Sequence, residues 1–122
     1  MKITRRFTQA GQSPYATIPF RRATSEIKNP DGSVVFRLEG FEVPEHWSQV
    51  AADILAQKYF RKAGVARALK KFEETQVPSW LWRSIPDDAA LASLSEKERF
   101  GGETDARQVF DRLAGTWTYW GW

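Results

Sequence analysis

The sequence contains no cysteine and only one histidine, His46, among its 122 residues. Without cysteine, this chain can form no disulfide, no thiolate metal site and no thiol or thiyl-radical centre. His46 lies beside Glu45 and one turn from Gln49, but one histidine without further ligands is poor support for metal binding or acid–base catalysis. We therefore predict no catalytic, cofactor-binding or metal-binding residue in this sequence.

Long apolar runs and phosphate-binding loops are also missing. No run approaches the length that spans a membrane, and the basic N-terminus lacks the apolar core of a secretory signal. Together with the lack of cysteine, this favours a cytoplasmic location and no membrane partner. Gly101 and Gly102 precede a predicted helix without the spacing of a nucleotide-binding loop, so a separate effector site has little support.

Aromatic residues, by contrast, are abundant: they make up 14% of the chain and include six tryptophans. A hydrophobic content of 42% and a charged content of 27% are typical of a single globular domain. The net charge of +3 is unevenly spread. Residues 1–22 carry five basic side chains and no acid, whereas residues 73–122 carry nine acids and five bases.

Residues 1–22 are predicted to form a basic extended arm, because Gly11, Pro14 and Pro19 interrupt any helix. One interpretation places this arm on nucleic acid or phosphates. The other ties it onto its own domain through isolated aromatic side chains. We favour the second, because five charges without an ordered groove are a weak signal.

Residues 23–122 are predicted to form one domain of the α+β class, mostly helical. A hairpin is expected at 24–43, with a type I turn at 29–32 in which Gly32 is free to take positive φ. A helix is expected at 44–63, with Pro44 in its first turn. Its expected apolar stripe is formed by Trp47, Val50, Ala51, Ile54, Leu55 and Tyr59. Residues 64–100 are expected to be irregular, with short turns near Ser79, Asp87 and Glu96.

The last predicted helix, 104–121, has an apolar stripe that runs to the end of the sequence. Its members are Ala106, Val109, Phe110, Leu113, Trp117 and Trp120. Three tryptophans and a tyrosine within the last six residues carry more apolar surface than a soluble protein usually exposes. Either they fold back onto the chain or the chain is cut from a larger protein, and we favour the latter. The predicted interface residues are Trp80, Trp82, Trp117, Trp120 and Trp122.

Several stretches, taken in order and spacing, resemble the N-terminal region of class II ribonucleotide reductases, the adenosylcobalamin (vitamin B12)-dependent enzymes. These stretches are residues 13–15, 24–27, 29–36, 47–51, 53–65, 77–83 and 101–122. The resemblance implies an oxidoreductase that makes deoxyribonucleotides for DNA synthesis, with its chemistry in a ten-stranded α/β barrel. A cysteine thiyl radical and a reducing cysteine pair carry that chemistry.

Because no cysteine is present, no catalytic residue of that family can be assigned to a position here. The resemblance implies a structural or regulatory N-terminal domain of a ribonucleoside-diphosphate reductase. Its partner would be the catalytic barrel of the same polypeptide, with a homodimer as a further option. Adenosylcobalamin, ribonucleotide substrates and deoxynucleotide effectors would bind only the parent enzyme.

A different class of function stays open, namely a small nucleic-acid-binding module. It would use basic side chains together with exposed tryptophans. Those basic residues are Arg5, Arg6, Arg21, Arg22, Lys58, Arg61 and Lys62. The acidic C-terminal half speaks against this alternative, so we expect no nucleic-acid partner.

Overall fold

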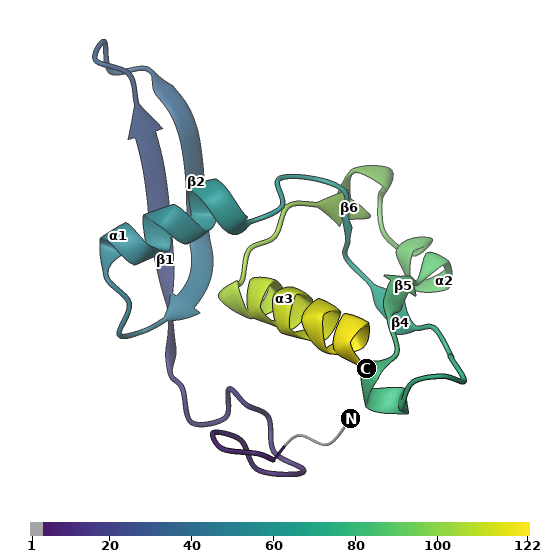
Figure 1. Ribbon diagram of the computed structural model, residues 1–122. Coiled ribbons are helices and arrows are strands. Elements are labelled where there is room, and N and C mark those ends of the chain that lie inside the picture. The colour runs from purple at the N-terminus through teal and green to yellow at the C-terminus, as the bar shows by residue number, and fades with distance from the viewer. Residues whose placement is uncertain (1–3) are drawn as a thin grey trace. The chain divides into compact units, whose positions relative to one another are not determined.

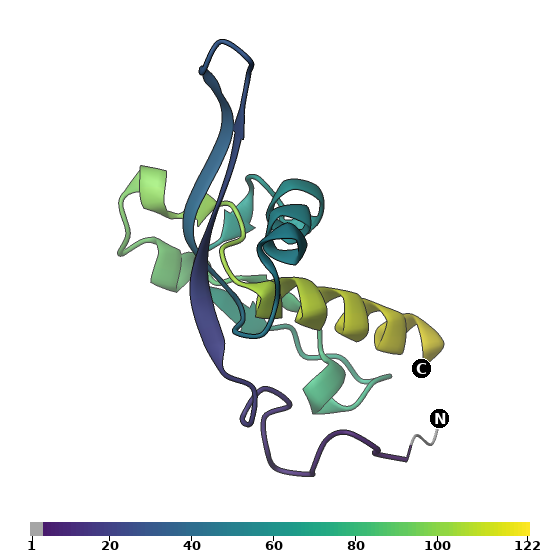
Figure 2. The ribbon, with the colours of Figure 1, turned by 90° about the vertical axis from the view of Figure 1, so that its left-hand side faces the viewer.

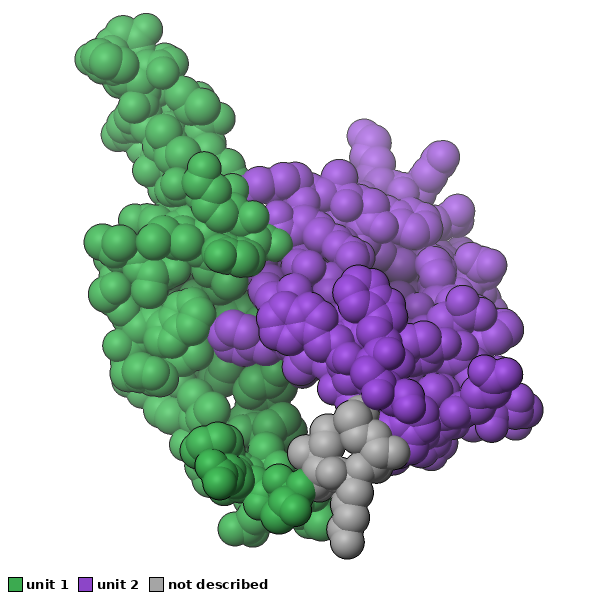
Figure 3. Space-filling view, viewed as in Figure 1, with its two compact units in different colours: residues 1–59, 104–107 green, residues 60–103, 108–122 purple. Residues whose placement is uncertain are grey.

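The computed structural model describes residues 4–122, and the chain divides into two compact units (Figure 3). Unit 1 comprises Met1–Tyr59 and Thr104–Arg107. Unit 2 comprises Phe60–Glu103 and Gln108–Trp122. The first three residues of the predicted basic arm lie outside the described residues.

A long antiparallel hairpin forms the frame of unit 1 (Figure 1). Strand β1 (Phe20–Lys28) pairs with β2 (Val34–Pro44), from Phe20 opposite Pro44 to Lys28 opposite Val34. The turn between the strands has the expected positive φ at Gly32, 88°, and the Gly32 amide donates to the Asn29 carbonyl at 2.9 Å. The hairpin is longer than predicted, since β1 already begins within the expected arm.

The base and the tip of the hairpin differ in burial. Near the base, Ala23, Ser25, Phe41 and Val43 are buried, whereas Val34 and Val35 at the tip are exposed. Helix α1 (Gln49–Ile54), continued by a π-helical turn (Leu55–Tyr59), lies across one face of the hairpin (Figures 1 and 2). The core of unit 1 therefore lies between α1 and the base of the hairpin.

Polar side chains fix α1 to β1. The Gln57 amide donates to the hydroxyl of buried Ser25 at 3.0 Å, and the Gln49 amide donates to the Thr24 carbonyl at 2.8 Å. Ser25 is thereby hydrogen-bonded although it is almost inaccessible to water, as a buried hydroxyl requires.

The predicted helix at 44–63 was wrong in its start and in part of its buried face. Pro44 ends β2 instead of starting a helix, and α1 begins at Gln49 with Ser48 as its N-cap, accepting from the Ala51 amide at 3.2 Å. Val50, in the expected apolar stripe, is 67% exposed, whereas Leu55 of the same stripe is buried as predicted. Ala52 and Ala56 complete the buried face.

Unit 2 contains short strands where irregular structure was expected. Strand β3 (Val65–Ala66) pairs with β6 (Phe100–Gly101), and β4 (Leu69–Lys71) pairs with β5 (Ser84–Pro86), both antiparallel. The remaining elements are the 3₁₀ turns Ser79–Leu81 and Glu96–Glu98 and helix α2 (Asp88–Leu91). These three occur where turns were predicted, and the Asp87 carboxylate caps α2 by accepting from the Ala90 amide.

Helix α3 (Ala106–Gly121) begins two residues after the predicted start. The Asp105 carboxylate accepts from the Arg107 amide at 2.9 Å, which satisfies one of the free donors of the first turn. Along α3, Ala106 and Val109 are buried, whereas the residues near Trp122 are exposed.

The α+β class is confirmed, but the expectation of a mostly helical chain is not. Antiparallel strands and helices account for comparable parts of the described residues. Within residues 4–122, no helix combines the length and the apolar character needed to cross a bilayer.

Candidate interface at the C-terminal end of α3

Large aromatic side chains of unit 2 are exposed at the end of α3 and in the turn that precedes β5. The exposed fractions are 77% for Trp120, 64% for Trp117, 64% for Trp80 and 44% for Trp122. We call these four side chains the aromatic surface. Trp80 and Trp122 touch edge to face, with ring centroids 5.6 Å apart. Large apolar side chains exposed in one region of the chain are typical of interaction sites on soluble proteins.

Trp82, the fifth predicted interface residue, has different surroundings. Its side chain is half-buried, and its indole N–H donates to the Glu74 carbonyl at 2.9 Å. The Trp82 carbonyl in turn accepts from the Lys71 ammonium at 3.0 Å. Trp82 therefore holds the segment around Glu74 in place, whereas the aromatic surface is formed by the other four tryptophans.

Glu74 connects this segment to α3. Its carboxylate accepts from the Tyr119 hydroxyl at 2.8 Å and from the Arg83 amide at 3.3 Å, and lies 3.5 Å from the Arg83 guanidinium. The hydrogen bond to Glu74 raises the pKa of the Tyr119 hydroxyl, because the bond holds the neutral phenol. A charge-assisted hydrogen bond thus ties the last turns of α3 to the segment around Glu74, which also belongs to unit 2.

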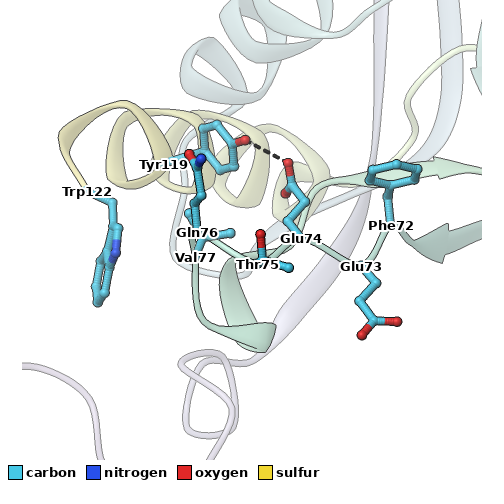
Figure 4. A pocket seen from close by; sticks show the side chains of 8 residues that line it. All are labelled: Phe72, Glu73, Glu74, Thr75, Gln76, Val77, Tyr119 and Trp122. Atoms are coloured by element: carbon cyan, nitrogen blue, oxygen red, sulfur yellow. Dashed lines mark hydrogen bonds between the residues drawn. The ribbon is translucent and has the colours of Figure 1, made fainter.

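A groove of about 560 Å³ lies beside this hydrogen bond (Figure 4). Its lining residues are Phe72, Glu73, Glu74, Thr75, Gln76, Val77, Tyr119 and Trp122. Glu73 stands at one end and Trp122 at the other (Figure 4). Sequence reasoning missed Glu73, Glu74 and the role of Tyr119, since a segment without periodicity gives no signal of which groups it brings together.

Near the start of α3, Glu103 forms a buried ion pair. Its side chain is 4% exposed and accepts from the Arg112 guanidinium at 2.9 Å and from the Arg61 amide at 2.7 Å. Gly102 precedes it at a close approach of two backbone segments, where an added Cβ would lie 3.0 Å from the Lys62 carbonyl oxygen. These contacts join the Arg61–Lys62 segment, Glu103 and Arg112 of α3.

The basic residues of the nucleic-acid alternative are divided between the two units. The Arg21 guanidinium donates to the Trp47 carbonyl at 2.7 Å, and Arg5 donates to the Thr8 hydroxyl at 3.1 Å. His46 is exposed in the turn that follows β2. Within the described part of the chain, no group of three or more histidine, aspartate or glutamate side chains is placed to hold a metal ion.

These features define a small α+β protein whose prominent surface feature, among the described residues, is a set of exposed tryptophans. The chain belongs to the class II vitamin B12-dependent ribonucleotide reductase family, whose N-terminal model matches residues 21–122. The resemblance inferred from the sequence is thereby confirmed.

Relatives support the same assignment. The chain is 70% identical, over all of its 122 residues, to the vitamin B12-dependent ribonucleotide reductases of Agrobacterium fabrum and of Bradyrhizobium diazoefficiens. A reductase of the same description from Streptomyces coelicolor is 39% identical over 64 residues, 52% of this chain and 7% of that protein. The chain spans 10% of the length of the first two relatives.

Proposed function

We propose that this chain is the structural N-terminal domain of a cobalamin-dependent ribonucleoside-diphosphate reductase. The parent enzyme would convert ribonucleotides to deoxyribonucleotides for DNA synthesis. In this proposal, the aromatic surface of unit 2 packs against the remainder of the same polypeptide. The observation that carries the proposal is the exposure of Trp80, Trp117, Trp120 and Trp122 around one helix end.

The energetic argument rests on the size of these side chains. A buried tryptophan removes a large apolar area from water, and aromatic anchors supply most of the binding energy in protein interfaces. Leaving four of them exposed offers no benefit to a free domain. Packing against a further part of the polypeptide converts that exposed surface into a stabilising contact.

The residues present do not fit the catalytic chemistry that the family resemblance implies. That chemistry requires cysteine thiols, and the chain has none. Adenosylcobalamin, the substrate and the effectors would therefore bind elsewhere in the parent enzyme, and we derive no catalytic step for this chain.

The proposal is tested by removing the aromatic surface in the full-length enzyme. The double variant Trp117→Ala, Trp120→Ala is compared with Phe7→Ala, which removes an aromatic side chain that is 96% exposed in unit 1. We expect the double variant to lower both the unfolding temperature and the rate of ribonucleotide reduction, and Phe7→Ala to change neither.

Unchanged stability and activity of the double variant would show that the packing role is wrong. Binding of oligonucleotides that weakens steeply with salt would instead support the nucleic-acid module, because such binding releases counterions. That result is measured on the same purified proteins by fluorescence anisotropy.

A further inference from the structure

The groove beside the aromatic surface combines aromatic side chains with carboxylates. Tyr119 and Trp122 come from α3, whereas Phe72, Glu73 and Glu74 come from the segment after β4 (Figure 4). Among the described residues that line the groove, the two glutamates are the only charged side chains. A groove of this composition complements a positive charge carried on an apolar stem.

The two carboxylates are not equivalent. Glu74 is already engaged by Tyr119 and Arg83. The Glu73 side chain is exposed, and within residues 4–122 no hydrogen bond or ion pair holds its carboxylate. A cation that entered the groove would therefore meet Glu73 without displacing an existing partner.

The same molecule shows which cation suits such surroundings. The Arg83 guanidinium lies 4.5 Å from the centre of the Phe72 ring and pairs with Glu74. In unit 1, the Arg107 guanidinium lies 3.6 Å from the centre of the Phe20 ring and pairs with Asp105 at 3.0 Å. Arginine stacks flat on aromatic faces and pairs with carboxylates through a planar fork, whereas a lysine ammonium lacks this planar geometry.

We propose that this groove receives an arginine-bearing segment from another part of the same full-length reductase polypeptide. The arginine pairs with Glu73, and an apolar neighbour of that arginine packs on Trp122 at the opposite end. A volume of about 560 Å³ holds more than one side chain and lies within the usual range of binding clefts. The inference rests on the proposed function, and adds the chemistry of the partner segment to it.

The experiment places a photo-crosslinking amino acid with a benzophenone group at Gln76, which lines the groove, in the full-length enzyme. The matched control places the same group at Glu98, an exposed position of the Glu96–Glu98 turn of unit 2. Crosslinked peptides are identified by mass spectrometry. We expect the Gln76 position to capture one segment of the same chain that contains arginine.

Charge reversal then tests the pairing. Glu73→Arg should lower the crosslink yield at Gln76 about tenfold, as expected when a close charge pair becomes a like-charge contact. Glu98→Arg is the matched control and should leave the yield unchanged. Raised salt should lower the yield of the unaltered enzyme and should not affect the Glu73→Arg variant.

Three results would overturn the inference: no crosslink, a crosslink to a segment without arginine, or a crosslink to a second copy of the protein. An unchanged yield in Glu73→Arg would also overturn it. If Trp117→Ala, Trp120→Ala still destabilises the enzyme in those cases, the packing role of the domain stands while the groove assignment falls. If neither the tryptophan double variant nor Glu73→Arg has an effect, the packing role and the groove assignment are both wrong.

Discussion

At its N-terminal end α3 buries Ala106 and Val109, whereas at its C-terminal end Trp117 and Trp120 are exposed. One apolar stripe runs through both ends at helical spacing. The difference therefore does not come from the periodicity of the sequence. It comes from what surrounds each end in the folded chain.

The polar contacts of the two ends differ in the same way. Near the first turns, the Glu103 carboxylate holds Arg112 and the Arg61 amide in a site almost closed to water. Near the last turns, the hydroxyl of the more exposed Tyr119 donates to the Glu74 carboxylate. The first end is held by buried polar contacts, whereas the second is the end that we propose packs against the remainder of the polypeptide.

The comparison predicts that the largest effect follows from breaking the buried anchor. Glu103→Ala leaves the Arg112 guanidinium and the Arg61 amide without their acceptor, and should lower the free energy of unfolding by about 3 kcal/mol. Glu103→Gln keeps an acceptor oxygen and should cost less. Denaturant unfolding measures both, with Glu98→Ala as an exposed control. Equal losses in Glu103→Ala and Glu98→Ala would contradict the anchor.

Two glycines sharpen the comparison because they differ in the space around them. Gly102→Ala places a Cβ 3.0 Å from the Lys62 carbonyl oxygen and should destabilise by about 2 kcal/mol through steric overlap. Gly115→Ala, inside α3, meets no atom within 4 Å and should stabilise by about 1 kcal/mol. The two midpoints of unfolding should therefore move in opposite directions. Shifts of the same sign would contradict this assignment.

A substitution at the exposed end of α3 should hardly change the stability of the 122-residue chain by itself. Trp120→Ala should change the free energy of unfolding of the 122-residue chain by less than about 0.5 kcal/mol, since an exposed side chain loses few contacts. In the full-length enzyme the same change should cost several times more. A difference between the two proteins, measured by thermal unfolding, supports a covered surface. Equal effects would mean that Trp120 stays exposed.

The smallest effect concerns pH. The bond to Glu74 raises the pKa of Tyr119, so its stabilising contribution is complete below the ordinary tyrosine pKa of about 10. This contribution is lost as pH rises through the higher value of the folded state. Ultraviolet titration of the phenolate should show one late tyrosine, absent in Tyr119→Phe. If all tyrosines titrated over the same pH range, the predicted hydrogen bond would be contradicted.

Local signals predicted part of the fold well. Asn29, Pro30 and Gly32 predicted the hairpin turn, and the stripe of α3 predicted the long helix within two residues of its start. Ser79 and Asp87 predicted short helical turns. Each of these signals depends on neighbouring residues, so it can be recognised before any tertiary contact is known.

Other features depended on partners distant in sequence. Pro44 was expected to start a helix, but pairing with Phe20 makes it the last residue of a strand. Val50 was expected to be buried, yet packing on the hairpin selects Ala52 and Ala56 instead. Strands of two or three residues, such as β3, have no periodicity of their own and exist only through their partner.

The sequence by itself determined the absence of thiol chemistry, the membership of the reductase family, the hairpin turn and the aromatic stripe. Only the tertiary structure decided which end of that stripe is buried, and that Glu73, Glu74 and Tyr119 share one groove. The physical reason is that turn and helix preferences act between near neighbours. Burial and charge pairing depend on groups that meet only when the chain folds.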